Sequence, residues 1–230
     1  IAEDLLAPDD PSIVSRLNNL GLAYSSKGMM QDAKAAYFRA IKIGLQMSPP
    51  APAIVHAYNN LATTLIHSKN YEEALASAQK ALEVNKLLNG DGETHIKNQI
   101  GAIYLKQKRY TDGIKVLNEA LDSHRKEGTI NNTKSNHAWF NLALNYLGNG
   151  QETEALNCFK KCMDNYGSGP RDKYYRIFEK RYEDLKKHQG TKDIKHDEIK
   201  EESDELNNEG VKEGVKEIND LKAQQIRNHD

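Results

Sequence analysis

The sequence has little of what ties a small secreted fold together or carries a chain across a membrane. Only two cysteines occur among its 230 residues, Cys158 and Cys162, which are too few for a disulfide framework and are typical of a reducing compartment. No apolar stretch approaches the roughly 18 residues that span a bilayer, and the mean hydropathy of -0.78 indicates a well-solvated chain. We therefore expect a cytoplasmic protein without a membrane span.

A surplus of charge of one sign is also missing. The 32 Lys+Arg residues almost balance 33 Asp+Glu residues, whereas a nucleic-acid or polybasic membrane binder normally carries a basic surplus. Residues 1–170 hold 35 charged side chains and residues 171–230 hold 30. We therefore predict a compact fold in the first part and a solvated segment in the second, with no nucleic-acid partner. The first residue is Ile1 rather than Met, and we expect a fragment or a processed form.

Four segments of the sequence align with one another. The first is Leu17-Asn-Asn-Leu-Gly-Leu-Ala-Tyr24, and its counterparts begin at Tyr58, Lys97 and Trp139. Small residues recur in these segments at intervals of 41, 39 and 42, at Gly21, Ala62, Gly101 and Ala143. A second set of small residues follows at the same intervals, at Ala33, Ala74, Gly113 and Ala155. A fixed period of this length predicts a repeat architecture.

Each unit is predicted to be a pair of helices. In the first unit Leu17, Leu20 and Tyr24 form one apolar stripe at helical spacing. A polar break follows, and a second helix then carries small and large residues in alternation, as in Ala33–Tyr37–Ala40. Small residues at fixed places allow two helix backbones to approach closely, and a larger side chain there would overpack the contact by about 1–3 kcal/mol. Because a single pair cannot bury its own stripe, we predict that the pairs stack.

This pattern of large, small and aromatic positions resembles the tetratricopeptide repeat over residues 13–165. The resemblance implies an all-α fold, a right-handed α-α superhelix that acts as a scaffold. The period near 41 and the doubled Asn resemble the kinesin light chain subgroup, and the stretch that resembles it most is Asp10–Gly21. The third unit departs from the family, because Lys97 stands where a large apolar residue is usual. No unit ends with the family's common proline.

The domain boundaries follow from the repeat and from composition. We predict helix pairs over about 13–45, 54–88, 93–126 and 134–166, and residues 1–12 could be the end of a preceding repeat. A stripe at helical spacing then predicts a capping helix over 171–188, with the alternative of a degenerate fifth repeat; the stripe consists of Tyr174, Phe178, Tyr182 and Leu185. Residues 189–230 are predicted to be a charged tail, disordered or marginally helical, that could alternatively fold on a partner.

A row of carboxamides marks the predicted binding face. The resemblance implies that the first helix of each pair lines a concave groove. Amides occupy seven of the eight places two and three positions before the first small residue: Asn18, Asn19, Asn59, Asn60, Asn98, Gln99 and Asn141. A carboxamide both donates and accepts hydrogen bonds, so this row, called the amide row below, could hold the backbone of an extended peptide. Bonding between neighbouring repeats and simple solvation are the alternatives.

Three histidines form a second row, six positions before the small residue, at His56, His95 and His137. We expect them to contact the partner, and a pH-sensitive grip is an alternative. A metal site is disfavoured, because direct ligands on three repeats would lie too far apart. The resemblance also implies positions for a carboxylate clamp built from Lys and Arg, but this chain has uncharged amides and His95 there, which disfavours such a clamp.

No catalytic motif accompanies these rows. The sequence has no nucleophile elbow, phosphate-binding Gly loop, zinc-binding helix or EF-hand loop, and we expect no cofactor. The leading hypothesis is a non-enzymatic scaffold or adaptor that binds an extended peptide or a partner helix in its groove. One alternative is a structural subunit of a motor, cytoskeletal or ciliary assembly that docks by its convex face or tail. The other is a regulatory fragment of a larger enzyme.

Overall fold

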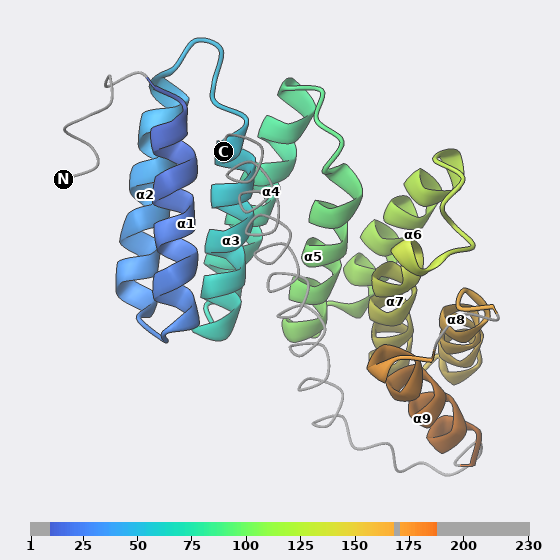
Figure 1. Ribbon diagram of the computed structural model, residues 1–230. Coiled ribbons are helices and arrows are strands. Elements are labelled where there is room, and N and C mark those ends of the chain that lie inside the picture. The colour runs from blue at the N-terminus through green and yellow to red at the C-terminus, as the bar shows by residue number, and fades with distance from the viewer. Residues whose placement is uncertain (1–9, 168–170, 188–230) are drawn as a thin grey trace, which may run out of the picture.

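The structure is a computed structural model that describes residues 10–167 and 171–187. Over these residues it contains only helices and turns, and the α-helices are α1 (Ser12–Ser26), α2 (Met30–Gln46), α3 (Ala53–His67), α4 (Tyr71–Leu87), α5 (Glu93–Lys106), α6 (Tyr110–Lys126), α7 (Asn136–Gly148), α8 (Glu152–Asp164) and α9 (Lys173–Lys187). A short 3-10 helix, η1 (Thr133–Ser135), precedes α7. The first eight α-helices form four antiparallel pairs in a row, and α9 lies against the last pair (Figure 1). The predicted all-α solenoid is confirmed.

Two of the predicted segments lie outside the described residues. These are the N-terminal segment, except for its last residues, and the charged tail. Within the described residues, no helix is long and apolar enough to cross a membrane.

The turn inside each pair has the same geometry in all four repeats. The backbone enters the left-handed region seven residues after the first small position, at Gly28, Lys69, Lys108 and Gly150. The residue after it then donates its N–H to the last turn of the first helix, as Met29 does to Tyr24 (3.0 Å) and Arg109 does to Tyr104 (2.9 Å). This is the Schellman arrangement, which satisfies carbonyls that a helix end leaves free.

The small residues lie where helices meet, as the spacing predicted. A Cβ placed on Gly21 would overlap the ring of Tyr37, and one on Gly101 would overlap the side chain of Leu117. The alanines of the two small-residue sets are all fully buried: Ala33, Ala62, Ala74, Ala143 and Ala155. Close backbone approach therefore compensates for the helix propensity that is lost at glycine.

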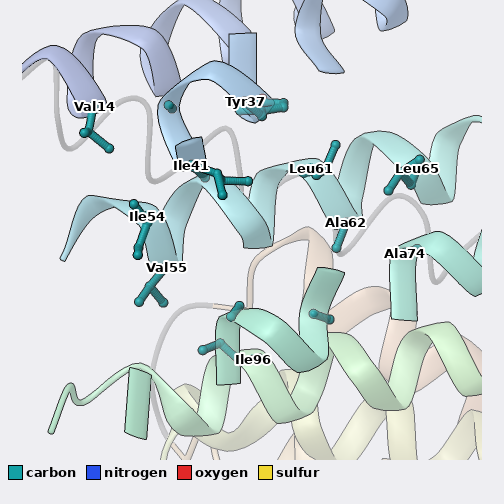
Figure 2. Close-up of a cluster of buried hydrophobic side chains, with 14 of the residues drawn as sticks. Val14, Tyr37, Ile41, Ile54, Val55, Leu61, Ala62, Leu65, Ala74 and Ile96 are labelled. Carbon is teal, nitrogen blue, oxygen red and sulfur yellow. The ribbon is translucent and has the colours of Figure 1, made fainter. Parts of the chain in front are cut away.

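The apolar core has two parts rather than one centre. One cluster joins the first two pairs to α5 through side chains such as Leu61 and Ile96 (Figure 2). The other joins Leu105 of α5 to α6, α7, α8 and α9 around Phe140 and Phe159, and Val116 packs against both clusters. Each repeat therefore depends mainly on its neighbours, as expected for a linear array.

Helix α9 covers the apolar end of the last pair. Phe178 and Leu185 are buried, and the Phe178 ring lies 5.4 Å from the ring of Phe140. Cys158 and Cys162 are buried free thiols in the same cluster. Desolvation raises the pKa of Cys158 to about 12, and burial raises the pKa of Cys162 well above its usual value. Their environment suits packing rather than reactivity.

The structure explains why a lysine, Lys97, can stand at a position where the repeat family usually has a large apolar residue. Its ammonium lies 2.9 Å from a carboxylate oxygen of Glu93 on the same helix and 3.3 Å from one of Glu119 on α6. The Lys97 side chain is only 10% exposed. A buried charge is stable in a protein only when it is paired and hydrogen-bonded. Two carboxylates thus allow a lysine to replace the usual apolar residue.

Candidate functional site

The amide row mainly connects one repeat to the next. Asn60 on α3 donates its amide N–H to Oδ1 of Asn18 on α1 across 2.9 Å. Asn141 on α7 donates to Oδ1 of Asn98 on α5 across 3.0 Å. In both cases an amide two positions before the small residue binds an amide three positions before it in the preceding repeat. These four side chains therefore act in contacts between repeats, which was the alternative interpretation of the row.

The junction between the second and third repeats uses a longer side chain. The amide nitrogen of Gln99 does not bond to the side chain of Asn59. It donates instead to the backbone carbonyl of Asn59 (3.0 Å) and to the hydroxyl of Thr63 (2.7 Å). The side-chain oxygen of Asn59 is left buried and accepts no hydrogen bond from the described residues. One extra methylene in Gln99 thus frees the side chain of Asn59 from the contact between repeats.

Asn145 extends this connection, although it belongs to neither the amide row nor the histidine row. It is fully buried and donates to the carbonyls of Asn141 (2.8 Å) and Gly101 (3.3 Å). A Cβ on Gly113 would overlap the Asn145 amide, so the glycine provides the space for it. The occurrence of Gly113, where the other units have Ala, is the signal that could have revealed this residue.

Some polar groups of the row remain available. The side chain of Asn19 makes no hydrogen bond with the described part of the chain. The same holds for three buried acceptors: Asn59 Oδ1, Gln99 Oε1 and Asn141 Oδ1. Buried polar atoms are normally paired, and each exception requires an explanation such as a bound water or a ligand. Protein atoms cover these three oxygens. On the face formed by α1, α3, α5 and α7, called the odd-helix face below, the polar groups that a partner can reach directly are therefore the half-buried side chain of Asn19 and the exposed His56 and His95.

The predicted histidines lie close enough to influence one another. His56 and His95 are exposed and His137 is half-buried. The pKa of His95 is lowered, first because the surrounding protein desolvates the imidazolium, and then by the positive charges of His137 and His56. His137 also meets the edge of Tyr174 on α9, with ring centroids 6.3 Å apart. His95 therefore senses the charges of its two neighbours in the row.

A pocket of about 220 Å³ opens at the N-terminal ends of α5 and α7. Its lining, called the histidine pocket below, consists of Asp91, Thr94, His95, Asn98, His124, Glu127, Lys134, His137 and Ala138. Three residues of the predicted site, His95, Asn98 and His137, thus line one pocket. The other predicted residues do not line it.

Part of the remaining lining comes from the connections between the predicted helix pairs, where Asp91 and Glu127 lie. His124 and Glu127 come from the C-terminal end of α6, and Lys134 belongs to η1. His124 is 9% exposed, and its Nδ1 lies 2.7 Å from the hydroxyl of Thr129. Burial lowers the pKa of His124, while Glu127 acts in the opposite direction. In the sequence, a third pocket histidine, His124, and two charged residues, Glu127 and Lys134, lie within or beside the connection between α6 and α7. This concentration was the signal that could have indicated the pocket.

The chemistry of this pocket is hydrogen bonding and charge. Among the described residues, no group of three or more His, Cys, Asp and Glu side chains has a geometry that could hold a metal ion. The pocket contains imidazoles, one amide, one hydroxyl, one ammonium and two carboxylates. Such a set can bind a polar group of a partner.

Comparison with known proteins identifies the repeats. Models of the tetratricopeptide repeat match residues 14–43, 54–96 and 92–168. Response regulator aspartate phosphatase E of Bacillus subtilis (strain 168) is 32% identical over 97 residues, which are 40% of this chain and 25% of that protein. The human intraflagellar transport protein 88 homolog is 30% identical over 104 residues, which are 45% of this chain and 12% of that protein. The chain thus spans a quarter or less of these relatives.

Solved structures show the same fold. The apo form of RapI superposes with a TM-score of 0.66 at 20% identity, over 88% of this chain and 70% of that one. The nearly identical TPR-like repeats attributed to a kinesin light chain of Podosopora anserina give a TM-score of 0.66 at 14% identity, over 85% of this chain and 95% of that one. At these identities the likeness concerns the fold.

Proposed function

Since this chain is built from tetratricopeptide repeats over residues 14–43 and 54–168, we propose that it is a non-enzymatic scaffold or adaptor. It would hold an extended peptide or a partner helix against the odd-helix face. The observation that carries this proposal is the row of accessible polar side chains on successive repeats, Asn19, His56 and His95, which take no part in the hydrogen bonds between repeats. The long period and the doubled Asn support, as part of this proposal, an adaptor of the kinesin-light-chain-like kind.

The amide row has two functions in this proposal. Asn18, Asn60 and Asn141 fix the spacing of the first helices by bonding between repeats. Asn19 and Asn59 take no part in such side-chain bonds, and they are the amides that contact the partner. His56 lies on α3 with Asn59, and His95 and His137 lie on the next two first helices, α5 and α7, where they add donors that change with pH.

Panning a random peptide library against the full chain tests the proposal. The double variant Asn19→Ala/Asn59→Ala removes two amides without breaking a side-chain bond between repeats. Each neutral hydrogen bond contributes about 0.5–1.5 kcal/mol, so selected peptides should bind roughly tenfold more weakly. Asn118→Ala is the matched control, because Asn118 is an exposed amide on α6. Selection of no peptide, or equal affinity for the double variant and the control, would contradict the proposal.

A second candidate function is docking inside a larger assembly through the even-numbered helices. Phe38 and Leu45 lie on the same face of α2, and their exposed fractions are 53% and 47%. Contiguous exposed apolar surface is typical of protein contacts, and under this candidate function the two side chains would contribute to such a surface on α2. The relative named as an intraflagellar transport protein supports a cytoskeletal or ciliary location. Under this alternative, Phe38→Gln/Leu45→Gln would release the partner, and the amide variant would not.

A further inference from the structure

The histidine pocket contains donors that the fold does not use. Asn98 is only 8% exposed, and its amide nitrogen donates to no atom of the described residues, although its oxygen accepts from Asn141. Lys134 forms no ion pair within residues 10–167 and 171–187. His95, whose imidazolium the surrounding protein desolvates, lies beside them in the lining. A ligand for this pocket must therefore supply hydrogen-bond acceptors.

The charge of the pocket depends on its imidazoles. Every element around it contributes a titratable or charged group: Asp91 before α5, His95 on α5, His124 and Glu127 at the end of α6, Lys134 in η1, His137 on α7, and His56 on the neighbouring α3. With neutral imidazoles, the two carboxylates outnumber the one ammonium and repel an anion. Protonation of His95, His124 and His137 reverses the sign.

We propose that the histidine pocket binds a carboxylate group of the partner and that this binding is coupled to proton uptake by the imidazoles. The proposal rests on the scaffold function above, and it specifies the chemistry of one end of that binding face. A volume of about 220 Å³ corresponds to roughly seven waters, which is enough for a carboxylate and the methylenes that carry it. Asn98 would donate to one oxygen, and the imidazolium groups and Lys134 would neutralise the charge.

The electrostatics of the free protein support this coupling. The pKa of His95 and that of His124 are both lowered, in each case chiefly by desolvation, so both rings are neutral near pH 7. A bound carboxylate would raise both pKa values, because an opposite charge favours the protonated form. Affinity must then increase as the pH falls towards the pKa values of the free protein.

Three short peptides test the proposal on the full chain. The first is tetraglutamate with both ends blocked, the second is blocked tetraglutamine, and the third is tetraglutamine with a free C-terminus. At about pH 5.5 at least one carboxylate peptide should bind about tenfold or more tightly than at about pH 7.5, and the Cε1–H resonances of His95 and His137 should move. The blocked tetraglutamine, which has no carboxylate, should bind weakly at both pH values. The first and third peptides distinguish a side-chain carboxylate from a chain terminus.

Variants separate the pocket from general electrostatics. His95→Gln/His137→Gln should reduce the pH dependence to the part that His124 retains, and Lys134→Gln, at an exposed position, should weaken binding at both pH values. His67→Gln is the control, because His67 is an exposed imidazole outside the pocket. Equal affinity at the two pH values, or an unchanged pH dependence in the double variant, would overturn the proposal. If the carboxylate binds here but the library yields no peptide, the scaffold function fails and the pocket stands.

Discussion

Asn141 donates a hydrogen bond of 3.0 Å to Asn98 in the preceding repeat, and both side chains are more than nine-tenths buried. The pair Asn60 and Asn18 repeats this contact two junctions earlier. In the last repeat, the equivalent of the accepting position is Phe140, which contacts the capping helix instead. The amide contacts therefore end where α9 covers the array.

Replacement of Asn141 should destabilise the fold. Asn141→Ala leaves Oδ1 of Asn98 buried without a donor, so the free energy of unfolding should fall by about 1–3 kcal/mol. Urea unfolding of the full chain measures it, with the exposed Asn118→Ala as the control, expected within about 0.5 kcal/mol of the parent. The double variant Asn98→Ala/Asn141→Ala should lose less than the sum of the single losses. Strict additivity would argue against the bond.

The sequence predicted the packing of this molecule better than its polar contacts. The recurrence of small residues was sufficient to predict the helix pairs, because close approach of two backbones requires small residues at the contact. These residues are Gly21, Ala62, Gly101 and Ala143. The partners of the amides could not be predicted in the same way. An amide on a helix face can point to the next repeat or to a ligand, and the choice depends on a few ångströms between neighbouring helices.

The pocket shows the same limit. His95, Asn98 and His137 lie on regular helices and could be selected from the repeat. Lys134 lies in the segment between α6 and α7, whose path follows from local bonds such as that of the Asn132 side chain to the N–H of Lys134 (3.0 Å). Repeat spacing contains no information about such a connection.

Two lysines occupy turn positions that favour glycine. Lys69 and Lys108 have φ values of 58° and 59°, whereas the other two repeats have Gly28 and Gly150 at this position. A left-handed conformation costs a residue with a Cβ roughly 1–2 kcal/mol, while glycine loses more chain entropy on folding. Lys69→Gly and Lys108→Gly should each therefore stabilise the protein by up to about 1 kcal/mol, as measured by thermal and urea unfolding.

The reverse changes are the control. Gly28→Ala and Gly150→Ala introduce the same strain without a new contact, because no atom lies near the added Cβ. Both should lower the midpoint of unfolding. A loss of stability in Lys69→Gly would show instead that its side chain makes a contact stronger than the strain.

The ion pairs of Lys97 should be dispensable at neutral pH. Glu93 and Glu119 are 35% and 48% exposed, so water can solvate both when the lysine is replaced. Lys97→Met fills a similar volume with an apolar chain, and replacing buried ion pairs in this way is often neutral or stabilising. Lys97→Ala leaves a void and should cost about 1–3 kcal/mol. Urea unfolding distinguishes the two variants.

The same lysine makes stability depend on pH. The hydrogen bond from Lys97 lowers the pKa of Glu93 below its usual 4.5, so the unfolded chain binds this proton more readily than the folded one. The contribution of Glu93 is present above the usual pKa and is lost as the pH falls through the lowered value. Acid unfolding of Lys97→Met should therefore show a weaker dependence on pH than that of the parent. An identical dependence would contradict the pairing.

Truncation of Phe178 should loosen one end of the array and leave the other end intact. The ring is 1% exposed and contacts Phe140, so Phe178→Ala should cost about 3–5 kcal/mol locally. The cluster that contains Phe178 is separate from the one around α1–α4, and openings in a linear array remain local. Amide hydrogen exchange should accelerate in α7 and α8 and change little in α1 and α2. Lys180→Ala, at an exposed site on α9, should change neither, and uniform acceleration over all helices would show one cooperative core.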